Sequence, residues 1–351
     1  MSRSLARAVA ALVCAGVLVA AGCGERTPTA APEQANLVPL PPPAGFERTI
    51  NPTYGQLPAF RDDPEADALQ AEQLAAGAPL LEGRFTNVRD GERATRRPAP
   101  CSCPTTTVWF FGGSAAFGIG QRDDGTIPSH LVRLAEADGR SVEVRNFGRP
   151  GETIAGEVAA FERRLAAEPP PDAVVFYDGF NDSLAGVVWA ALHDEVDPDR
   201  PVALLGEDVL RYVDGYPPVT DVGGPEVVAR TVVARYRAQR TKALELAARH
   251  GVAAHFVFQP DAFGSRTHMR SFLEALGYRD EELEAGLRWV DRADLPRVLD
   301  ATSRELSPEV VNLRRSLDDV GEPIFAGVVH TNERGAELVA IELDRLLRGD
   351  R

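Results

Sequence analysis

Short apolar runs alternate with longer amphipathic stretches from about residue 105 to the end of the chain. The runs Thr107–Phe111, Val142–Phe147, Ala173–Tyr177 and Ala253–Phe258 are rich in β-branched and aromatic residues. Each is too short for a helix of its own, so each predicts a buried strand. A fifth apolar run, Pro323–Val329, is predicted as the last strand.

The stretches between these runs repeat apolar residues every three or four positions, which predicts helices. The predicted helices cover residues 127–138, 154–165, 225–250, 267–276, 281–289, 308–317 and the segment after Asn332. Strands that alternate with helices favour right-handed crossovers and a parallel sheet. We therefore predict an α/β fold: a single flavodoxin-like three-layer domain with a five-stranded, mostly parallel sheet.

The start of the chain has the pattern of an export signal. Arg3 and Arg7 precede an uninterrupted apolar run, Ala8–Ala21, and small residues follow it. The segment Val19–Cys23 resembles a bacterial lipoprotein signal, in which the cysteine becomes the first residue and carries the lipid. This resemblance implies that Cys23 is lipidated and that the protein is exported and anchored to a bacterial membrane at the cell envelope.

We divide the chain into a signal (residues 1–22), a proline-rich tether or extension (23–103) and the α/β domain (104–351). Residues 24–100 show no clear strand pattern, and their prolines oppose regular structure. A helix is compatible with Ala66–Ala76. The segment could hold the domain away from a membrane or wrap around it, and the sequence leaves both open. It also leaves open whether Cys101 and Cys103 form a disulfide or are free thiols.

Charge and cysteine content exclude several classes of function. The 351 residues carry 52 acidic and 38 basic side chains, a net charge of -14. Binding of nucleic acid needs clustered Lys and Arg, so we expect no nucleic-acid partner. None of the 4 cysteines stands near a His or Asp at metal-ligand spacing, so we expect no metal site. Gly118 and Gly120 lack the third glycine of a dinucleotide motif, and we expect no cofactor.

Polar residues and glycines cluster where the predicted strands end. Gly112–Ser114 follows the first strand, Asn146–Thr153 the second, Gly179–Asp182 the third, and His330 the last. The carboxyl ends of parallel strands meet at one edge of a sheet, where open α/β folds bind their ligands. We therefore expect these four blocks to form one site.

The four blocks, in this order, resemble the SGNH (GDSL) hydrolase family, and the resemblance covers about residues 104–348. It implies that Ser114 is the nucleophile and His330 the general base. It also implies three oxyanion donors: the backbone N–H groups of Ser114 and Gly151 and the side-chain amide of Asn181. Gly113 replaces an Asp that many members carry beside the serine, but that Asp is not the catalytic acid.

One departure concerns the histidine. The family usually has an Asp three residues before it, and this position is Gly327. A backbone carbonyl could orient His330 instead, the protein could be a weakened or inactive hydrolase, or another carboxylate could substitute. The candidates for that substitution are Asp318, Asp319 and Glu322.

The predicted function is serine-dependent hydrolysis of a carboxylic ester, of esterase, lipase or deacetylase type, in a protein tethered to the cell envelope. The expected substrate is a small-molecule or carbohydrate ester. Two alternatives stay open: an O-acyltransferase that uses a sugar hydroxyl as acceptor, and an inactivated hydrolase fold that acts as a carbohydrate- or lipid-binding lipoprotein.

Overall fold

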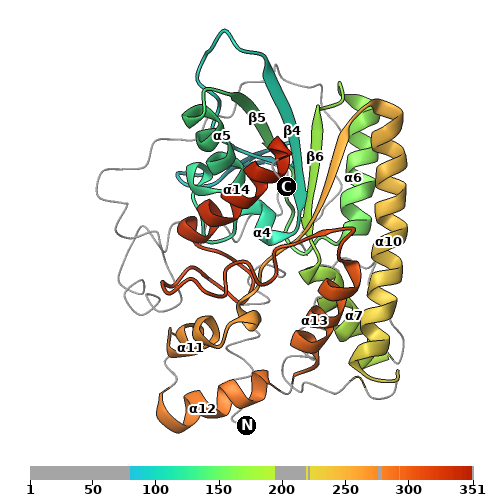
Figure 1. Cartoon of the computed structure of the whole chain (residues 1–351), viewed down its shortest axis with the longest axis vertical. Helices are drawn as coiled ribbons and strands as arrows, with labels where there is room; N and C mark the ends of the chain where they lie inside the picture. Colours follow the sequence, from blue (N-terminus) through green and yellow to red (C-terminus); the bar gives the residue numbers. More distant parts are fainter. Residues whose placement is uncertain (1–79, 194–218, 220–221, 276–278, 292, 350–351) are drawn as a thin grey trace.

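A mixed, mostly parallel sheet forms the centre of the protein. The computed structural model describes residues 80–193, 219, 222–275, 279–291 and 293–349 (Figure 1). In this part, eight strands are ordered β1-β2-β3-β5-β4-β6-β7-β8. The parallel centre consists of β4 (Thr105–Gly112), β5 (Ser141–Asn146), β6 (Ala173–Asp178) and β7 (Ala253–Phe258). These are the first four predicted strands, so the α/β class is confirmed, but the sheet has eight strands rather than five.

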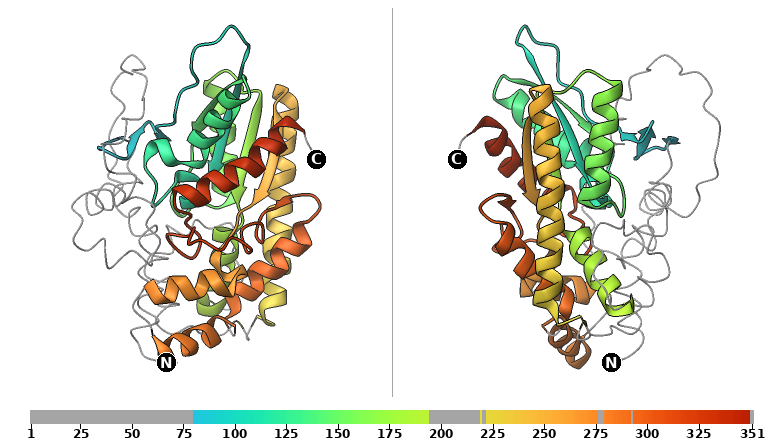
Figure 2. Two further views of the ribbon diagram at one scale, coloured as in Figure 1. Left: turned by 60° about the vertical axis from the view of Figure 1, so that its left-hand side comes forward. Right: turned by 90° about the vertical axis from the view of Figure 1, so that its right-hand side faces the viewer.

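Helices cover both faces of this sheet, as Figures 1 and 2 show. One face carries α5 (Ile127–Ala137) and α14 (Glu333–Arg348), and the other carries α6 (Ile154–Ala167) and α10 (Pro225–His250). Predicted helices at 267–276 and 281–289 are confirmed as α11 (Arg266–Ala275) and α12 (Asp280–Val290). Two further helices, α7 (Phe180–His193) and α13 (Asp294–Leu306), were not predicted, and both pack against α10.

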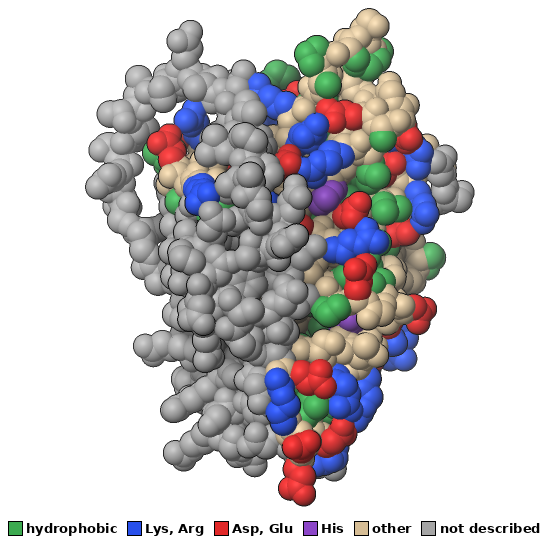
Figure 3. Space-filling view, turned by 90° about the vertical axis from the view of Figure 1, so that its left-hand side faces the viewer, with side chains coloured by type: hydrophobic (Ala, Val, Ile, Leu, Met, Phe, Trp, Pro, Cys, Tyr) green, Lys and Arg blue, Asp and Glu red, His purple; other side chains and the backbone are tan. Residues whose placement is uncertain are grey.

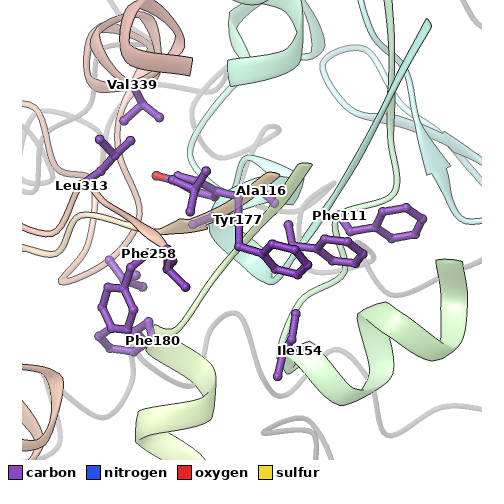
Figure 4. Packing of buried hydrophobic residues seen from close by; sticks show 14 of the residues in the cluster. Phe111, Ala116, Ile154, Tyr177, Phe180, Phe258, Leu313 and Val339 are labelled. Atoms are coloured by element: carbon purple, nitrogen blue, oxygen red, sulfur yellow. The ribbon is translucent and has the colours of Figure 1, made fainter. Parts of the chain in front are cut away.

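Aromatic side chains fill the space between the sheet and the helices. On the α6 side, Phe176 stacks on Phe111 and Phe256, with ring centroids 5.7 and 5.0 Å apart, and Phe161 of α6 meets this row edge-on. On the opposite side Phe110 stacks on Tyr177 at 5.8 Å. Figure 4 shows Phe111 and Tyr177 on opposite sides of the sheet. Side chains alternate between the faces of a strand, so these runs of consecutive apolar residues are buried on both sides.

Three short strands extend the sheet before the predicted domain begins. They are β1 (Leu80–Glu82), β2 (Asn87–Arg89) and β3 (Glu92–Arg93), all antiparallel to their neighbours. The prediction that residues 24–100 contain no strand is therefore wrong from residue 80 onward. Runs of two or three residues are too short to show an alternating pattern. The signal available was Asp90-Gly91, whose φ angles of 53° and 71° form the two-residue hairpin turn between β2 and β3.

A buried arginine fastens this segment to the rest of the fold. Arg93 donates to the Asp123 carboxylate at 3.0 Å and to the carbonyl oxygens of Phe117, Gly118 and Gln121 at 2.6–2.7 Å. Its side chain is fully buried. The loop after the catalytic-serine candidate is thus held by a residue that lies outside the predicted domain.

The chain between residues 308 and 329 also differs from the prediction. The predicted helix over 308–317 is wrong, because this segment holds strand β8 (Val311–Asn312), which pairs with β7. The predicted strand Pro323–Val329 is wrong as well. Its only β contact in the described chain is an isolated bridge between Phe325 and Thr331. The run turns back on itself instead, because the N–H groups of Ala326 and Gly327 donate to the carbonyl of His330 at 2.7 and 3.1 Å.

Other predictions about the first part of the chain are only partly addressed. Cys101 and Cys103 are joined in a disulfide, one of the two alternatives left open. The signal segment, Cys23 and the predicted helix Ala66–Ala76 lie outside the described residues, and the division into signal, extension and domain stays a prediction. No helix in the described ranges is long and apolar enough to span a membrane.

The anchoring role of Arg93 is testable by mutation. Arg93→Met leaves the buried Asp123 carboxylate without its cation, so we expect a loss of about 3–5 kcal/mol in the free energy of unfolding. Arg97→Met is the matched control, because Arg97 is exposed, and it should change that energy by less than about 0.5 kcal/mol. Urea unfolding of both variants measures the difference. Equal losses would contradict the assigned role.

Candidate active site

Ser114 lies at the carboxyl end of the central strand. β4 ends at Gly112, and Ser114 is the first residue of the single-turn helix α4 (Ser114–Phe117). The Ser114 residue is 7% exposed, so it lies just beneath the surface. The first N–H groups of a helix have no partner within the helix, so the Ser114 backbone N–H is of the kind that can receive an anionic oxygen.

Two glycines before Ser114 allow an unusually close approach of neighbouring strands. A Cβ atom added to Gly112 would lie 2.2 Å from the carbonyl oxygen of Tyr177, and one added to Gly113 would lie 2.3 Å from Nδ2 of Asn181. Both distances are far below van der Waals contact. The Asn181 amide therefore occupies the space that any side chain at 113 would need.

The imidazole of His330 contacts Ser114 directly. Nε2 of His330 lies 2.8 Å from Oγ of Ser114, although 216 residues separate them in the chain. His330 is 5% exposed and follows the turn in which its carbonyl accepts from Ala326 and Gly327. The structure therefore brings together the two residues predicted to be nucleophile and base.

The segment after His330 is fixed to the loop that follows α4. Nε2 of Gln121 donates to the Thr331 carbonyl and hydroxyl at 2.8 and 3.0 Å. Arg122 forms an ion pair with Glu333 at 2.6 Å. Asn332 accepts from the Gly335 N–H at 2.9 Å and so caps α14. These contacts fix the histidine through its neighbours on the chain.

Burial determines the protonation of this histidine. Removal from water lowers the pKa of His330 to about 4, because a buried imidazole is less costly when neutral. Asp318 and Glu322 instead pair with Arg315 and Arg334.

Asp319 is exposed, and no carboxylate in the described residues forms an ion pair with His330. None of the three carboxylates considered as substitutes for the missing Asp therefore contacts His330.

The second block lies against β4 and α4. The Phe147 and Arg149 N–H groups donate to the carbonyls of Phe110 and Gly112 at 2.7 and 2.8 Å. A Cβ on Gly148 would lie 2.3 Å from the Phe117 nitrogen, so only glycine fits there. Gly151 is buried and has φ of 75°, a left-handed conformation that favours glycine.

Asn181 joins the second and third blocks. Its Nδ2 donates to the Glu152 carbonyl at 2.7 Å, which places the amide next to Gly151 and Gly113. An amide nitrogen carries two N–H groups, so the second can donate to a bound oxygen. All the site residues predicted within the domain, Ser114, Gly151, Asn181 and His330, thus lie at this edge of the sheet.

Several residues near this site were not predicted. Oδ1 of Asp182 accepts from the Ile154 N–H at 3.2 Å, at the start of α6. Glu157 and Asp178 are buried nearby. Asp178 directly follows the apolar run Ala173–Tyr177, and Glu157 lies on the apolar stripe of its helix, so both signals were present in the sequence.

Two observations on the described residues concern charge and metal binding. Basic and acidic side chains are interspersed among the described residues on the face in Figure 3. No group of three or more His, Cys, Asp or Glu among the described residues is arranged to hold a metal ion.

No protein-family model and no curated protein matches the sequence, but solved structures do. They include a lipolytic protein of the G-D-S-L family from Veillonella parvula (18% identity, 69% of this chain and 97% of that chain covered, TM-score 0.35). A lipase/acylhydrolase from Enterococcus faecalis also matches, with 16% identity, 70% of this chain and 96% of that chain covered, and a TM-score of 0.39. A variant of an acetyl-xylooligosaccharide esterase from Geobacillus stearmophilus matches with 15% identity, 68% of this chain and 93% of that chain covered, and a TM-score of 0.37. The first is described with the family name that the four sequence blocks suggest.

No carboxylate of the described residues forms an ion pair with His330, so we predict that the buried ring titrates at low pH. The His330 ring should titrate near pH 4 by NMR, with the signal assigned by its loss in His330→Gln. Gly327→Asp should raise this pKa, because a nearby carboxylate stabilises the charged ring. A wild-type midpoint at or above about 6.5, the ordinary histidine value, would instead indicate an acidic partner.

Proposed function

We propose that the protein is a serine-dependent carboxylic-ester hydrolase of the SGNH class. The observation that carries this proposal is the 2.8 Å contact between Oγ of Ser114 and Nε2 of His330. A hydroxyl in hydrogen-bond contact with an imidazole is the arrangement that activates serine as a nucleophile. The position at the carboxyl edge of a parallel sheet supports the same interpretation.

The proposed reaction has two similar halves. Ser114 Oγ attacks the ester carbonyl while His330 takes its proton, and the histidine then gives that proton to the leaving alcohol. Water attacks the acyl-enzyme in the second half, again with His330 as base. The lowered pKa of His330 keeps the ring neutral at pH 7, so it is ready to accept a proton.

Negative charge on the tetrahedral intermediate would be stabilised by neutral donors. The backbone N–H groups of Ser114 and Gly151 and Nδ2 of Asn181 are the proposed oxyanion hole. Their position around one edge of the sheet supports this assignment, since such donors act best when they are fixed in advance.

The glycine at position 327, where a triad acid is expected, favours a second candidate function. In a triad, an acid holds the base in the correct tautomer and stabilises its charged form, and loss of that Asp function can cost about 10⁴ in rate. With Gly327 in that position, an inactivated hydrolase that binds carbohydrate or lipid esters is the alternative. An acyltransferase that uses a sugar acceptor keeps the same site chemistry and differs only in the acceptor.

Turnover of p-nitrophenyl acetate tests the first proposal. Ser114→Ala and His330→Ala should each lower kcat/KM by about 10⁴-fold or more, because they remove nucleophile and base. Asn181→Ala should lower it about 10²–10³-fold, the cost of one oxyanion donor.

The control is His250→Ala, an exposed histidine at the end of α10 that should leave the rate unchanged. Wild-type turnover no higher than that of Ser114→Ala would favour the binding protein. Transfer of acetyl to an added sugar in preference to water would favour the acyltransferase.

We also propose that Cys23 is lipidated and that residues after it tether the domain to the cell envelope. The support is the basic, apolar and small-residue order of residues 3–23. Expressed in a bacterium, the wild type should fractionate with membranes and carry lipid on Cys23 by mass spectrometry. Cys23→Ala should be unlipidated. Recovery of an intact, unmodified wild-type chain would contradict the proposal.

A further inference from the structure

Three carboxyl groups are buried together behind the proposed oxyanion hole. Glu157 of α6, Asp178 at the end of β6 and Asp182 of α7 are each 2% exposed. Tyr236 of α10 lies against them and is also buried. The proposed mechanism uses none of these side chains.

Among the described residues, the titratable groups that act most strongly on Glu157 are acids. Asp178, Asp182 and Glu152 act on its charge, and Tyr236 faces it from α10. Burial and the negative charges of Asp178 and Asp182 raise the pKa of Glu157 well above its ordinary value. Three ionised carboxylates in this apolar setting would repel one another strongly, since the interior screens charge poorly.

Unpaired carboxylate oxygens indicate that this cluster holds a proton, and burial and the charge of Asp182 raise the pKa of Asp178 as well. Tyr236 donates its hydroxyl to Oδ1 of Asp178 at 2.7 Å. With every carboxyl ionised, both Glu157 oxygens and Oδ2 of Asp178 have no donor among the described residues. A proton on Glu157 converts its contact with Asp178 into a hydrogen bond that Asp178 accepts. Asp178 is then the charged acceptor of two donors.

This cluster is connected to the proposed oxyanion hole on two sides. Asp182 accepts from the N–H of Ile154, the first residue of α6, three residues after Gly151. Asn181, which precedes Asp182, donates to the Glu152 carbonyl at 2.7 Å. A displacement of α6 from β6 would therefore move both the Gly151 backbone and the Asn181 amide.

We propose that Glu157 carries a proton that it shares with Asp178, and that this proton holds Gly151 and Asn181 in their oxyanion-binding positions. Glu157 is thus a positioning residue, and its link to catalysis rests on the ester hydrolase function proposed above. Loss of the proton at alkaline pH leaves two adjacent buried anions. Their repulsion separates α6 from β6 and the site loses activity.

The first experiment measures kcat/KM for p-nitrophenyl acetate from about pH 5 to about pH 10. The background rate measured with Ser114→Ala at each pH is subtracted. Wild-type kcat/KM should fall about tenfold per pH unit above the pKa of the shared proton. Glu157→Gln should lack this decline, because its amide donates to Asp178 at every pH. Glu162→Gln, an exposed change on the same helix, should keep the wild-type profile.

The second experiment measures thermal stability against pH and does not depend on catalysis. The folded-state pKa of Glu157 is raised, so its contribution to stability is complete below its unfolded pKa of about 4.5 and is lost as pH rises through the folded value. The Tm of Glu157→Gln should therefore increase relative to wild type as pH rises. Asp178→Asn should also reduce this pH dependence, because it removes the neighbouring charge.

Each outcome has one meaning. A pH-independent Tm difference between wild type and Glu157→Gln, or a Glu157→Gln chain that does not fold, overturns the shared proton. An alkaline decline in Glu157→Gln equal to that of wild type overturns the positioning role. Absence of Ser114-dependent turnover in wild type overturns the ester hydrolase and with it the positioning role. The Tm measurements then still decide whether the proton is shared.

Discussion

Close approach of backbone at the carboxyl end of the sheet is the constraint on which the site depends. A Cβ atom at Gly112 or Gly148 would lie 2.2 or 2.3 Å from backbone atoms, and one at Gly113 would displace the Asn181 amide. Tyr177 and Asn181 can approach Ser114 only because these positions lack side chains. Any larger residue would separate β4 from its neighbours, and the proposed oxyanion donors would no longer converge. The geometry of the site is therefore a consequence of strand packing more than of individual catalytic side chains.

His330, the proposed base, is held in place without an ion pair to any carboxylate of the described residues. The described residues hold His330 through its own turn, in which Ala326 and Gly327 donate to its carbonyl, and through Oγ of Ser114. In a triad the acid would also stabilise the imidazolium that forms during reaction. Here burial opposes that charged form. In the proposed mechanism, electrostatic stabilisation would therefore act on the oxyanion more than on the base.

Much of this arrangement could be predicted from the sequence, and the errors have physical reasons. Strands β4 to β7 are long apolar runs, so their positions followed from the sequence pattern. The meeting of Ser114 with His330 followed from the four-block resemblance, although the strand expected before His330 does not form. The run Pro323–Val329 is also largely apolar but forms a turn, because the N–H groups of Ala326 and Gly327 donate to the carbonyl of His330 and not to a neighbouring strand. The short strands β1 to β3 carry no periodic signal, and their place depends on Arg93, whose partners are distant in sequence.

The buried carboxyls matter because of the charge that the proposed reaction creates. Ser114, Gly151 and Asn181 offer neutral dipoles to the oxyanion, with no cation among them. Two unit charges about 10 Å apart repel by about 1.7 kcal/mol at an effective dielectric constant of about 20, which is roughly tenfold in rate. Each anion behind the oxyanion hole would oppose the transition state on that scale. A proton on Glu157 removes one such charge and adds a hydrogen bond, so the electrostatic and positioning effects act in the same direction.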